Sequence, residues 1–232
     1  MDSTPILQEA VEILRKGGVI LYPTDTVWGI GCDATNEAAV ARVFEIKRRS
    51  EAKSLVLLAS DLDRVATYVK QIPSIAIDLV EVNDAPMTII YPGAQYLAPN
   101  AVAEDGSVGI RIPLVPEDEA SEDEAPARKG AAPKGNLTAG AFCRELVRRL
   151  RRPLVSTSAN ISGEETPSCF EEISEEIRSG VDYVVPASVT LEAAGKPTAA
   201  GKGSVRFDDS ATGQSSQIIK LGLDGEVEII RP

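Results

Sequence analysis

The chain has 232 residues, of which 43% are apolar, and 24 basic against 35 acidic side chains give a net charge of −11. A chain of this length buries a core large enough to fold without disulfides or a structural metal, and its acidic balance argues against a protein that coats nucleic acid. It contains no histidine, which excludes Ser-His-Asp and Cys-His mechanisms and every histidine-containing zinc site.

The cysteines and the apolar runs bear on the compartment. Cys32, Cys143 and Cys169 are far apart and form no CxxC pair, so we expect reduced thiols that serve as small core residues, which favours a cytoplasmic location. No run of 18 apolar residues occurs, and the N-terminus lacks the apolar stretch of a signal peptide. We therefore expect neither a membrane span nor a secretory leader.

The first predicted elements are a helix and a strand. The helix begins near Ser3 or Thr4, carries Pro5 in its first turn and ends at Gly17 and Gly18. An apolar strand is predicted directly afterwards, at 19–22.

Helix and strand patterns continue to alternate along the chain. Asn36 is placed to cap a helix from Glu37 to about Arg48, and Asp61 is placed to cap another. Strand-like runs lie at 54–59, 87–91, 107–112, 154–157, 183–185, 216–221 and 226–230, and a further helix is predicted at 138–151. This alternation predicts an α/β fold, one domain over residues 1–232, with a largely or partly parallel sheet.

One segment, residues 116–135, does not fit this pattern. It reads PEDEASEDEAPARKGAAPKG, with six acidic and three basic residues and almost no bulky apolar side chain. Such a composition cannot bury enough apolar surface to become ordered. We expect an acidic, flexible surface loop, and a solvated linker without function is its simplest interpretation.

Polar side chains follow the predicted strand at 19–22 directly. Thr24, Asp25 and Thr26 lie within YPTDTVWGIG, residues 22–31. Ligands of open α/β sheets gather beyond the carboxyl ends of strands, so two hydroxyls and a carboxylate are placed there to hold a small polar ligand. The alternative is a tight turn in which these side chains bond their own backbone.

A basic cluster ends the helix predicted from Glu37. Lys47, Arg48, Arg49 and Lys53 lie within seven residues. Interaction with the negative end of the helix dipole is one explanation. A polyanionic ligand is the other, because four cations exceed what a helix end needs and guanidinium groups suit phosphate or carboxylate.

A third polar stretch, STSANISG at 156–163, follows the apolar strand residues Leu154 and Val155. It holds four hydroxyls and one amide and no charge. Such groups are costly to bury without a ligand or a network, although a self-bonded turn would also satisfy them.

In this order, YPTDTVWGIG, the K-x-R of Lys47 and Arg49 and the S-x-N of Ser158 and Asn160 resemble the YrdC-like threonylcarbamoyl-AMP synthases. The resemblance covers residues 7–231 apart from the acidic segment. It implies a twisted, mixed α/β sheet flanked by helices, with a large concave cavity. It also implies a nucleotidyltransferase that joins L-threonine, bicarbonate and ATP into L-threonylcarbamoyl-AMP and releases pyrophosphate.

The resemblance extends to cofactors and partners. Mg²⁺ accompanies ATP in this family, and no protein-bound metal or metal ligand is evident in the sequence. Partner proteins transfer the threonylcarbamoyl group to adenosine 37 of tRNAs that read codons beginning with A. The resemblance therefore implies tRNA-modifying partners in the cytoplasm, with room for direct RNA contact.

Matched position by position, the resemblance implies site residues of three kinds. Charge stabilisation during catalysis falls to Lys47 and Arg49. ATP contacts fall to Arg49, Lys53, Ser107, Asn160, Ser168 and Arg231. Threonine contacts fall to Thr26, Arg111, Ser158 and Ser216.

Two positions depart from the family pattern. Leu58 stands where many members have a histidine, and Gln217 replaces the usual threonine. That histidine cannot be essential if this protein is active. The reaction needs no nucleophilic side chain, because the amine of threonine attacks bicarbonate or carbon dioxide and the carbamate attacks the α-phosphorus. The protein's task is positioning and charge stabilisation.

Two alternatives stay open at this point. One is an RNA-binding translation or ribosome-maturation factor, for which a basic stripe supplies the candidate surface: Arg144, Arg148, Arg149, Arg151 and Arg152. Solvated helix charge also explains that stripe. The other is a paralogue that retains only nucleotide binding, which Leu58 leaves open.

Overall fold

A nine-stranded mixed sheet forms the centre of the part described by the computed structural model, residues 3–49, 55–115, 138–190 and 204–232. From edge to edge its strands are β11 (Val227–Arg231), β10 (Gln217–Leu221), β4 (Met87–Tyr91), β5 (Val108–Arg111), β3 (Val56–Leu58), β6 (Leu154–Ser158), β2 (Gly29–Gly31), β1 (Ile20–Tyr22) and β7 (Tyr183–Val184). The pairs β10–β4, β3–β5 and β1–β7 are parallel and the rest are antiparallel. The expected partly parallel sheet is confirmed.

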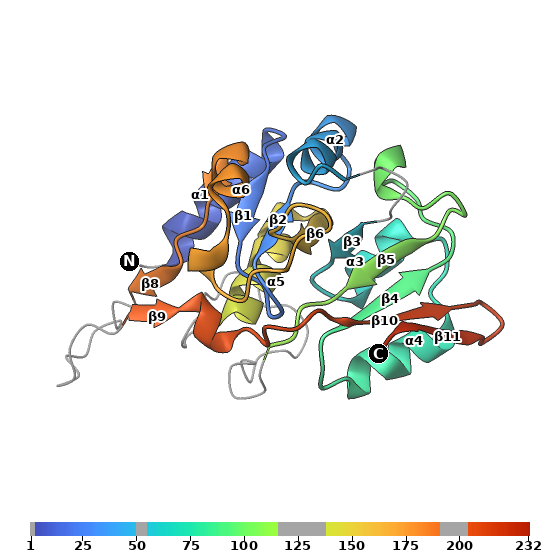
Figure 1. Cartoon of the computed structure of the whole chain (residues 1–232). Helices are drawn as coiled ribbons and strands as arrows, with labels where there is room; N and C mark the ends of the chain where they lie inside the picture. Colours follow the sequence, from blue (N-terminus) through green and yellow to red (C-terminus); the bar gives the residue numbers. More distant parts are fainter. Residues whose placement is uncertain (1–2, 50–54, 116–137, 191–203) are drawn as a thin grey trace.

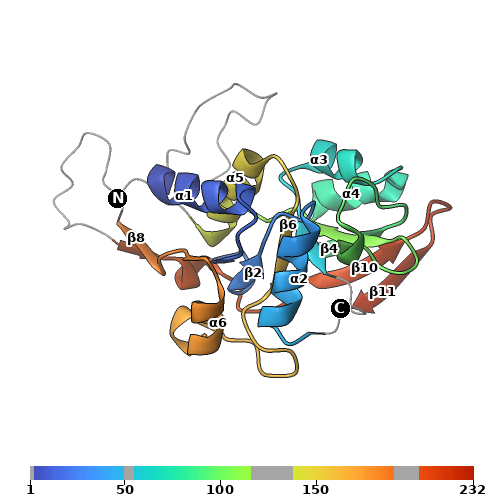
Figure 2. The same cartoon turned by 90° about the horizontal axis from the view of Figure 1, so that it is seen from above.

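Helices cover both faces of this sheet (Figure 1). Along one side, as Figure 2 shows, lie α1 (Ser3–Arg15), α5 (Ala139–Leu150), α3 (Leu62–Tyr68) and α4 (Ser74–Val82). Along the other lie α2 (Glu37–Ile46) and α6 (Glu175–Gly180). The remaining elements are a separate ribbon, β8 (Ser188–Thr190) with β9 (Ser204–Arg206), and short 3₁₀ helices η1 (Pro99–Ala101), η2 (Phe170–Glu172) and η3 (Phe207–Ser210). The acidic segment expected at 116–135 lies outside the described residues.

Several helices begin where capping chemistry predicts. Asn36 accepts a hydrogen bond from the backbone N–H of Ala39 at 3.1 Å, and Asp61 accepts one from Arg64 at 2.7 Å. Each cap satisfies an N–H group that the first turn of a helix leaves without a partner. The apolar residues that follow Asn36 face the core as predicted, including Val40, Val43 and Phe44.

Helix α2 ends two residues earlier than predicted, and the way it ends shapes the site. Arg48 adopts a left-handed backbone conformation, with φ of 48°. The N–H of Arg48 bonds to Glu45 O and the N–H of Arg49 bonds to Phe44 O, which is a Schellman ending with arginine in the place usually taken by glycine. The reversal leaves Arg48 on the surface, paired with Glu176, and separates it from its two basic neighbours.

Strand β2 was not predicted, because its sequence Gly-Ile-Gly lacks the usual residues of a strand. A Cβ at Gly31 would lie 2.1 Å from the carbonyl oxygen of Val155 and 2.8 Å from the ring of Tyr22. Glycine is therefore required for this strand to lie against β6 and over Tyr22. As a result, the polar YPTDTVW loop is held between two strands of the sheet.

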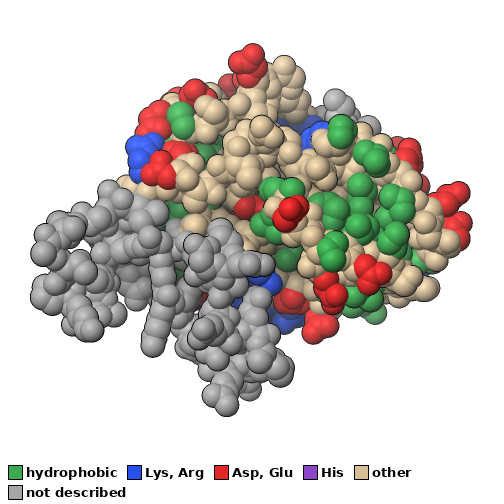
Figure 3. All heavy atoms as spheres, turned by 90° about the horizontal axis from the view of Figure 1, so that it is seen from below, with side chains coloured by type: hydrophobic (Ala, Val, Ile, Leu, Met, Phe, Trp, Pro, Cys, Tyr) green, Lys and Arg blue, Asp and Glu red, His purple; other side chains and the backbone are tan. Residues whose placement is uncertain are grey.

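An apolar surface lies at the β11 edge of the sheet. Figure 3, seen from below, shows apolar side chains gathered where α4 and β11 lie. The exposed large apolar residues of these elements are Ile77, Val82, Val227, Ile229 and Ile230. Natural sheets usually protect such edges with charged residues, proline or a covering element.

Candidate functional site

A pocket of about 230 Å³ lies beside the C-terminal end of α2. Its walls come from the β1–β2 loop, from the turn after α2, and from six strands of the sheet. The lining residues are Thr24, Thr26, Val27, Trp28, Gly29, Arg49, Val56, Arg111, Ser156, Thr157, Ser158, Ser215, Ser216, Ile218 and Arg231.

The pocket brings together six of the site residues that the resemblance implied. These are Thr26, Arg49, Arg111, Ser158, Ser216 and Arg231. Sheet register explains part of the convergence, because paired residues of neighbouring strands share a face. Val56 pairs with Ser156, and Gly29 pairs with Ser158.

The polar β1–β2 loop is partly a self-bonded turn. The hydroxyl of Thr24 donates to Val27 O at 2.7 Å and also accepts from the N–H of Thr26 at 3.1 Å. This is the turn interpretation considered for YPTDTVWGIG, and it holds for Thr24. Thr26 is placed by this turn, with its Oγ1 2.8 Å from that of Thr24 and its side chain at the pocket wall.

Arg111 and Asp25 form a buried ion pair under the pocket. Arg111 is 3% exposed and Asp25 is 5% exposed. Asp25 Oδ1 accepts from Nη1 of Arg111, and Oδ2 accepts from the N–H of Leu114 at 3.0 Å. Nη2 of Arg111 lies 3.4 Å from Thr26 Oγ1. Both carboxylate oxygens of Asp25 are thus engaged within the protein, and Asp25 is not among the residues that line the pocket.

The ion pair also fixes the charge state of Arg111. Burial alone lowers the pKa of a guanidinium, but Asp25 outweighs this effect and raises the pKa of Arg111 overall. Arg111 therefore stays protonated at the pocket wall, with its second nitrogen toward Thr26. A charged guanidinium beside a hydroxyl is suited to bind a carboxylate.

The opposite wall is built by β10 and β11. Arg231 donates from Nε and Nη2 to the carbonyl oxygen of Ser216, at 2.9 and 2.5 Å. The hydroxyl of Ser216 lies 2.8 Å from that of Thr88. These bonds hold Ser216 and Arg231 together at one rim of the pocket.

Arg49 enters the pocket from the turn after α2. Its Nη1 lies 3.4 Å from Thr157 Oγ1, and burial lowers the pKa of the guanidinium. The Schellman ending of α2 thus directs Arg49 to the pocket while Arg48 faces solvent.

Lys47 does not line the pocket. It is 2% exposed, and its Nζ donates to the carbonyl oxygens of Ser158 and Asn160, the latter at 2.7 Å. Burial, with a further contribution from Arg49, lowers the pKa of Lys47 to about 8. The ammonium therefore contacts the backbone of the S-x-N turn, which differs from the direct role at a phosphate expected for it.

Three other implied contacts also lie away from the pocket wall. Ser107 is bonded through its hydroxyl to Asp105 at 2.5 Å, at the opposite end of β5 from Arg111. Ser168 donates to Glu172 at 2.8 Å in the η2 turn.

Asn160 is the third of these contacts, and it is engaged within its own loop. Its amide nitrogen donates to Ile161 O and Glu164 O, at 3.1 and 2.8 Å. Lys53 lies outside the described residues.

Leu58, which stands where the resemblance places a histidine, lies inside the sheet. It pairs with Arg111 across β3 and β5 and with Leu154 across β3 and β6, and it is fully buried. It lies on the same face of β3 as Val56, two residues away, but is not among the residues that line the pocket.

Several pocket residues were missed by sequence reasoning. Trp28, Val56, Ser215 and Ile218 carry no chemistry that singles them out. Val56 and Ile218 could have been found from strand alternation once a strand neighbour was assigned to the site. Trp28 is placed by tertiary contacts: its Nε1 donates to Asp208 at 2.6 Å.

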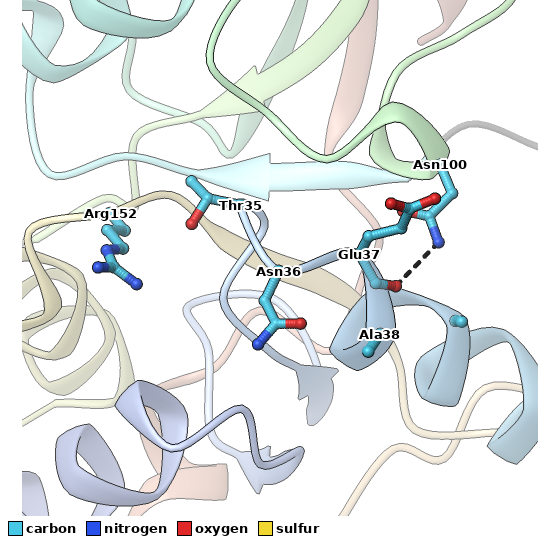
Figure 4. A pocket seen from close by; sticks show the side chains of 7 residues that line it. Thr35, Asn36, Glu37, Ala38, Asn100 and Arg152 are labelled. Carbon is cyan, nitrogen blue, oxygen red and sulfur yellow. Dashed lines mark hydrogen bonds between the residues drawn. The ribbon is translucent and has the colours of Figure 1, made fainter.

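A second depression lies beside the N-terminus of α2 (Figure 4). It is larger and more open than the pocket at Arg111, and it contains none of the implied site residues. Arg152 at one side is bound to Asp33 at 2.6 Å, and Asn100 at the other donates to Glu37 O at 3.1 Å. Its polar side chains do not converge on a common point, so we take the pocket at Arg111 as the candidate site.

The lowered pKa of Lys47 predicts a pH effect on stability. The folded protein releases this proton near pH 8, whereas the unfolded chain holds it to about pH 10.5. Stability contributed by Lys47 therefore rises with pH across this window. The difference in unfolding free energy, wild type minus Lys47→Met, should increase by about 1–3 kcal/mol from pH 8 to pH 10.5 in urea denaturation. A difference that stays flat would show that the lysine is not desolvated.

The comparisons with known proteins agree on a family. The model of the Sua5/YciO/YrdC family, described as telomere recombination, matches residues 12–118 and 136–198. A threonylcarbamoyl-AMP synthase of Hahella chejuensis is 28% identical over 208 residues, covering 89% of this chain and 95% of that protein. One of Idiomarina loihiensis is 30% identical over 184 residues, covering 78% and 85%. The chain belongs to the Sua5/YciO/YrdC family.

Family membership confirms the resemblance drawn from the three motifs. The fold is shared with P. abyssi Sua5 complexed with L-threonine, with a TM-score of 0.65 and 23% identity, over 95% of this chain and 52% of that one. The chain thus spans about half the length of that Sua5 structure. Among the described residues, no Cys, Asp and Glu side chains are grouped to hold a metal ion. None of the described helices is long and apolar enough to cross a membrane.

Proposed function

We propose that this protein synthesises L-threonylcarbamoyl-AMP and pyrophosphate from L-threonine, bicarbonate and ATP. The observation that carries the proposal is one pocket whose described lining holds three arginines and several hydroxyls and no carboxylate. Two relatives named threonylcarbamoyl-AMP synthase support it, as does the fold shared with a Sua5 complexed with L-threonine.

The amino-acid substrate fits the wall around Arg111. Its carboxylate meets the protonated guanidinium, and the hydroxyls of Thr26 and Ser216 supply hydrogen bonds on either side. The amine then attacks the carbon of bicarbonate, with loss of water, or of carbon dioxide, with loss of a proton from nitrogen, and forms a carbamate. This step needs no protein nucleophile, so the absence of histidine is no obstacle.

The nucleotide fits the side of the pocket where Arg49 and Arg231 lie. The carbamate oxygen attacks the α-phosphorus, the bond to the β-phosphate oxygen breaks, and pyrophosphate leaves. Negative charge grows on the phosphorus oxygens during this step, and a forked guanidinium such as that of Arg49 stabilises it.

The four remaining contacts implied by the resemblance stay proposals for the more distant parts of ATP: Lys53, Ser107, Asn160 and Ser168. Ser107 precedes β5 and Arg111 ends it, which separates them by about 13 Å at 3.3 Å per residue. A ligand pair that contacts both must therefore extend along the strand, as two substrates lying end to end would.

Mg²⁺ enters this scheme with ATP. The described lining of the pocket offers hydroxyl and carbonyl oxygens but no carboxylate, and Asp25 beneath it is paired with Arg111. A site of this kind does not hold Mg²⁺ by itself, and the phosphates and water supply most of its ligands. When bound, the ion neutralises charge on the leaving pyrophosphate.

The proposed product, L-threonylcarbamoyl-AMP, is a reactive mixed anhydride that serves as substrate for another reaction. We propose that tRNA-modifying partner proteins use it to modify adenosine 37 of tRNAs that read codons beginning with A. Free thiols at Cys32, Cys143 and Cys169 fit a cytoplasmic setting for that work.

The RNA-binding alternative has less support. The basic stripe is largely engaged within the protein: Arg148 and Arg149 bind Glu145, Arg152 binds Asp33, and Arg144 donates to Ser60 O. These contacts fit solvated helix charge better than a surface for a phosphate backbone.

One assay separates the candidate functions. Purified protein with Mg²⁺ and ATP should release pyrophosphate only when both L-threonine and bicarbonate are present, measured by a coupled phosphate assay. Equal release without threonine would point to the nucleotide-binding paralogue. No release under any condition, together with tight RNA binding in a filter assay, would favour the RNA-binding factor.

A further inference from the structure

Lys47 lies beside the pocket, but its charged side chain does not line it. Its Nζ donates to two backbone carbonyls, those of Ser158 and Asn160, and it is nearly inaccessible to solvent. A ligand of ATP would have to direct its ammonium at the phosphates. From where it lies, Lys47 reaches the substrates only through the turn that it holds.

Lys47 forms hydrogen bonds to that turn through both its side chain and its backbone. The carbonyl oxygen of Lys47 accepts from the N–H of Ser162 at 2.9 Å. Inside the turn, Ser158 Oγ donates to Asn160 Oδ1 at 2.5 Å, and the N–H of Asn160 bonds back to Ser158 O at 3.0 Å. The turn is thus tied to the end of α2 at three points between residues 158 and 162.

The arrangement is costly, which separates it from ordinary packing. A buried ammonium normally has a carboxylate partner, because desolvation penalises the charged form. Within the described residues, Lys47 forms no ion pair, and the nearby charge that acts on it is the cation Arg49. A methionine would fill the same space without the cost of burying a charge. We therefore attribute the lysine at this position to the hydrogen bonds that its ammonium makes with the two carbonyls.

We propose that Lys47 is a positioning residue: it fixes the carbonyls of Ser158 and Asn160 and thereby sets the S-x-N side chains against the substrates, without touching either substrate. The proposal rests on the proposed function for the identity of those substrates. It replaces a direct role for Lys47 at the phosphates, and the two roles differ in a measurable way.

The first test is L-threonine binding without ATP, by isothermal titration calorimetry. Lys47→Met should weaken threonine binding by at least about tenfold, because Ser158 loses its fixed position. A lysine that acts only on ATP phosphates would leave this affinity unchanged, and that result would overturn the proposal. The matched control is Arg48→Met, one residue away on the surface, which should bind threonine like the wild type.

The second test is a double-mutant cycle with Ser158→Ala. If Lys47 acts through Ser158, Lys47→Met should change threonine affinity less than about twofold once the Ser158 hydroxyl is gone. Full additivity of the two substitutions would overturn the proposal, because it would mean that Lys47 contributes by another route.

A third readout does not depend on the reaction. Amide hydrogen exchange at 159–162 should be at least about tenfold faster in Lys47→Met than in the wild type or Arg48→Met. Unchanged exchange would overturn the positioning role. If Lys47→Met fails to fold, Lys47→Gln keeps a donor and replaces it in all three tests, with smaller changes of the same sign expected.

The same set of measurements separates this inference from the proposed function. A wild type that neither binds threonine nor releases pyrophosphate would refute the proposed function. The exchange rates at 159–162 would still decide whether Lys47 holds the turn.

Discussion

Replacing Arg111 with methionine should lower the unfolding free energy by about 3–5 kcal/mol and abolish threonine-dependent pyrophosphate release. The substitution leaves the carboxylate of Asp25 buried without its cation, which is among the most destabilising changes known for a single residue. It also removes the group that we expect to bind the carboxylate of threonine. Urea denaturation and the pyrophosphate assay measure the two effects separately.

The double variant Asp25→Asn with Arg111→Met distinguishes stability from function. It removes both charges, and the oxygen of asparagine can still accept from the N–H of Leu114. We expect most of the lost stability to return while activity stays absent. A double variant as unstable as Arg111→Met would show that the unpaired charge is not the cause, and recovered activity would show that Arg111 does not bind threonine.

Replacing Arg49 with lysine should reduce kcat/KM by at least about 30-fold, which corresponds to roughly 2 kcal/mol of transition-state stabilisation. An ammonium cannot reproduce two parallel N–H bonds to a phosphate. Stability should change by no more than about 0.5 kcal/mol, because the charge is kept and the side chain lines an open pocket. Steady-state kinetics and urea denaturation are the measurements.

Arg48→Lys is the matched control for Arg49→Lys. Arg48 is adjacent in the chain but lies on the surface, paired with Glu176. Exposed pairs of this kind contribute little, so this variant should remain near the wild type in both rate and stability. If the two lysine variants lose activity equally, Arg49 is only a charge at a helix end.

Local chemistry decided much of the fold before any tertiary contact was considered. Asn36 and Asp61 start their helices because short side-chain oxygens satisfy the first N–H groups of a helix, a contact made within three residues. The apolar runs of the core strands were predicted for the same reason, since burial of alternating or continuous apolar residues depends on the segment itself. Strand β2 was not predicted, because only its tertiary neighbours, Tyr22 and β6, explain why glycine is needed there.

The polar residues of the site were visible in the sequence, but their partners were not. The YPTDT, K-x-R and S-x-N motifs pointed to Thr26, Arg49 and Ser158, which line the pocket. Only the tertiary structure decided that Asp25 is paired with Arg111, that Lys47 faces two carbonyls, and that Arg49 reaches the pocket. These outcomes depend on side chains that approach from strands and loops about 85 to 113 residues away along the chain. Spacing along one segment carries no information about such contacts, because sheet register and the turn that ends α2 set them.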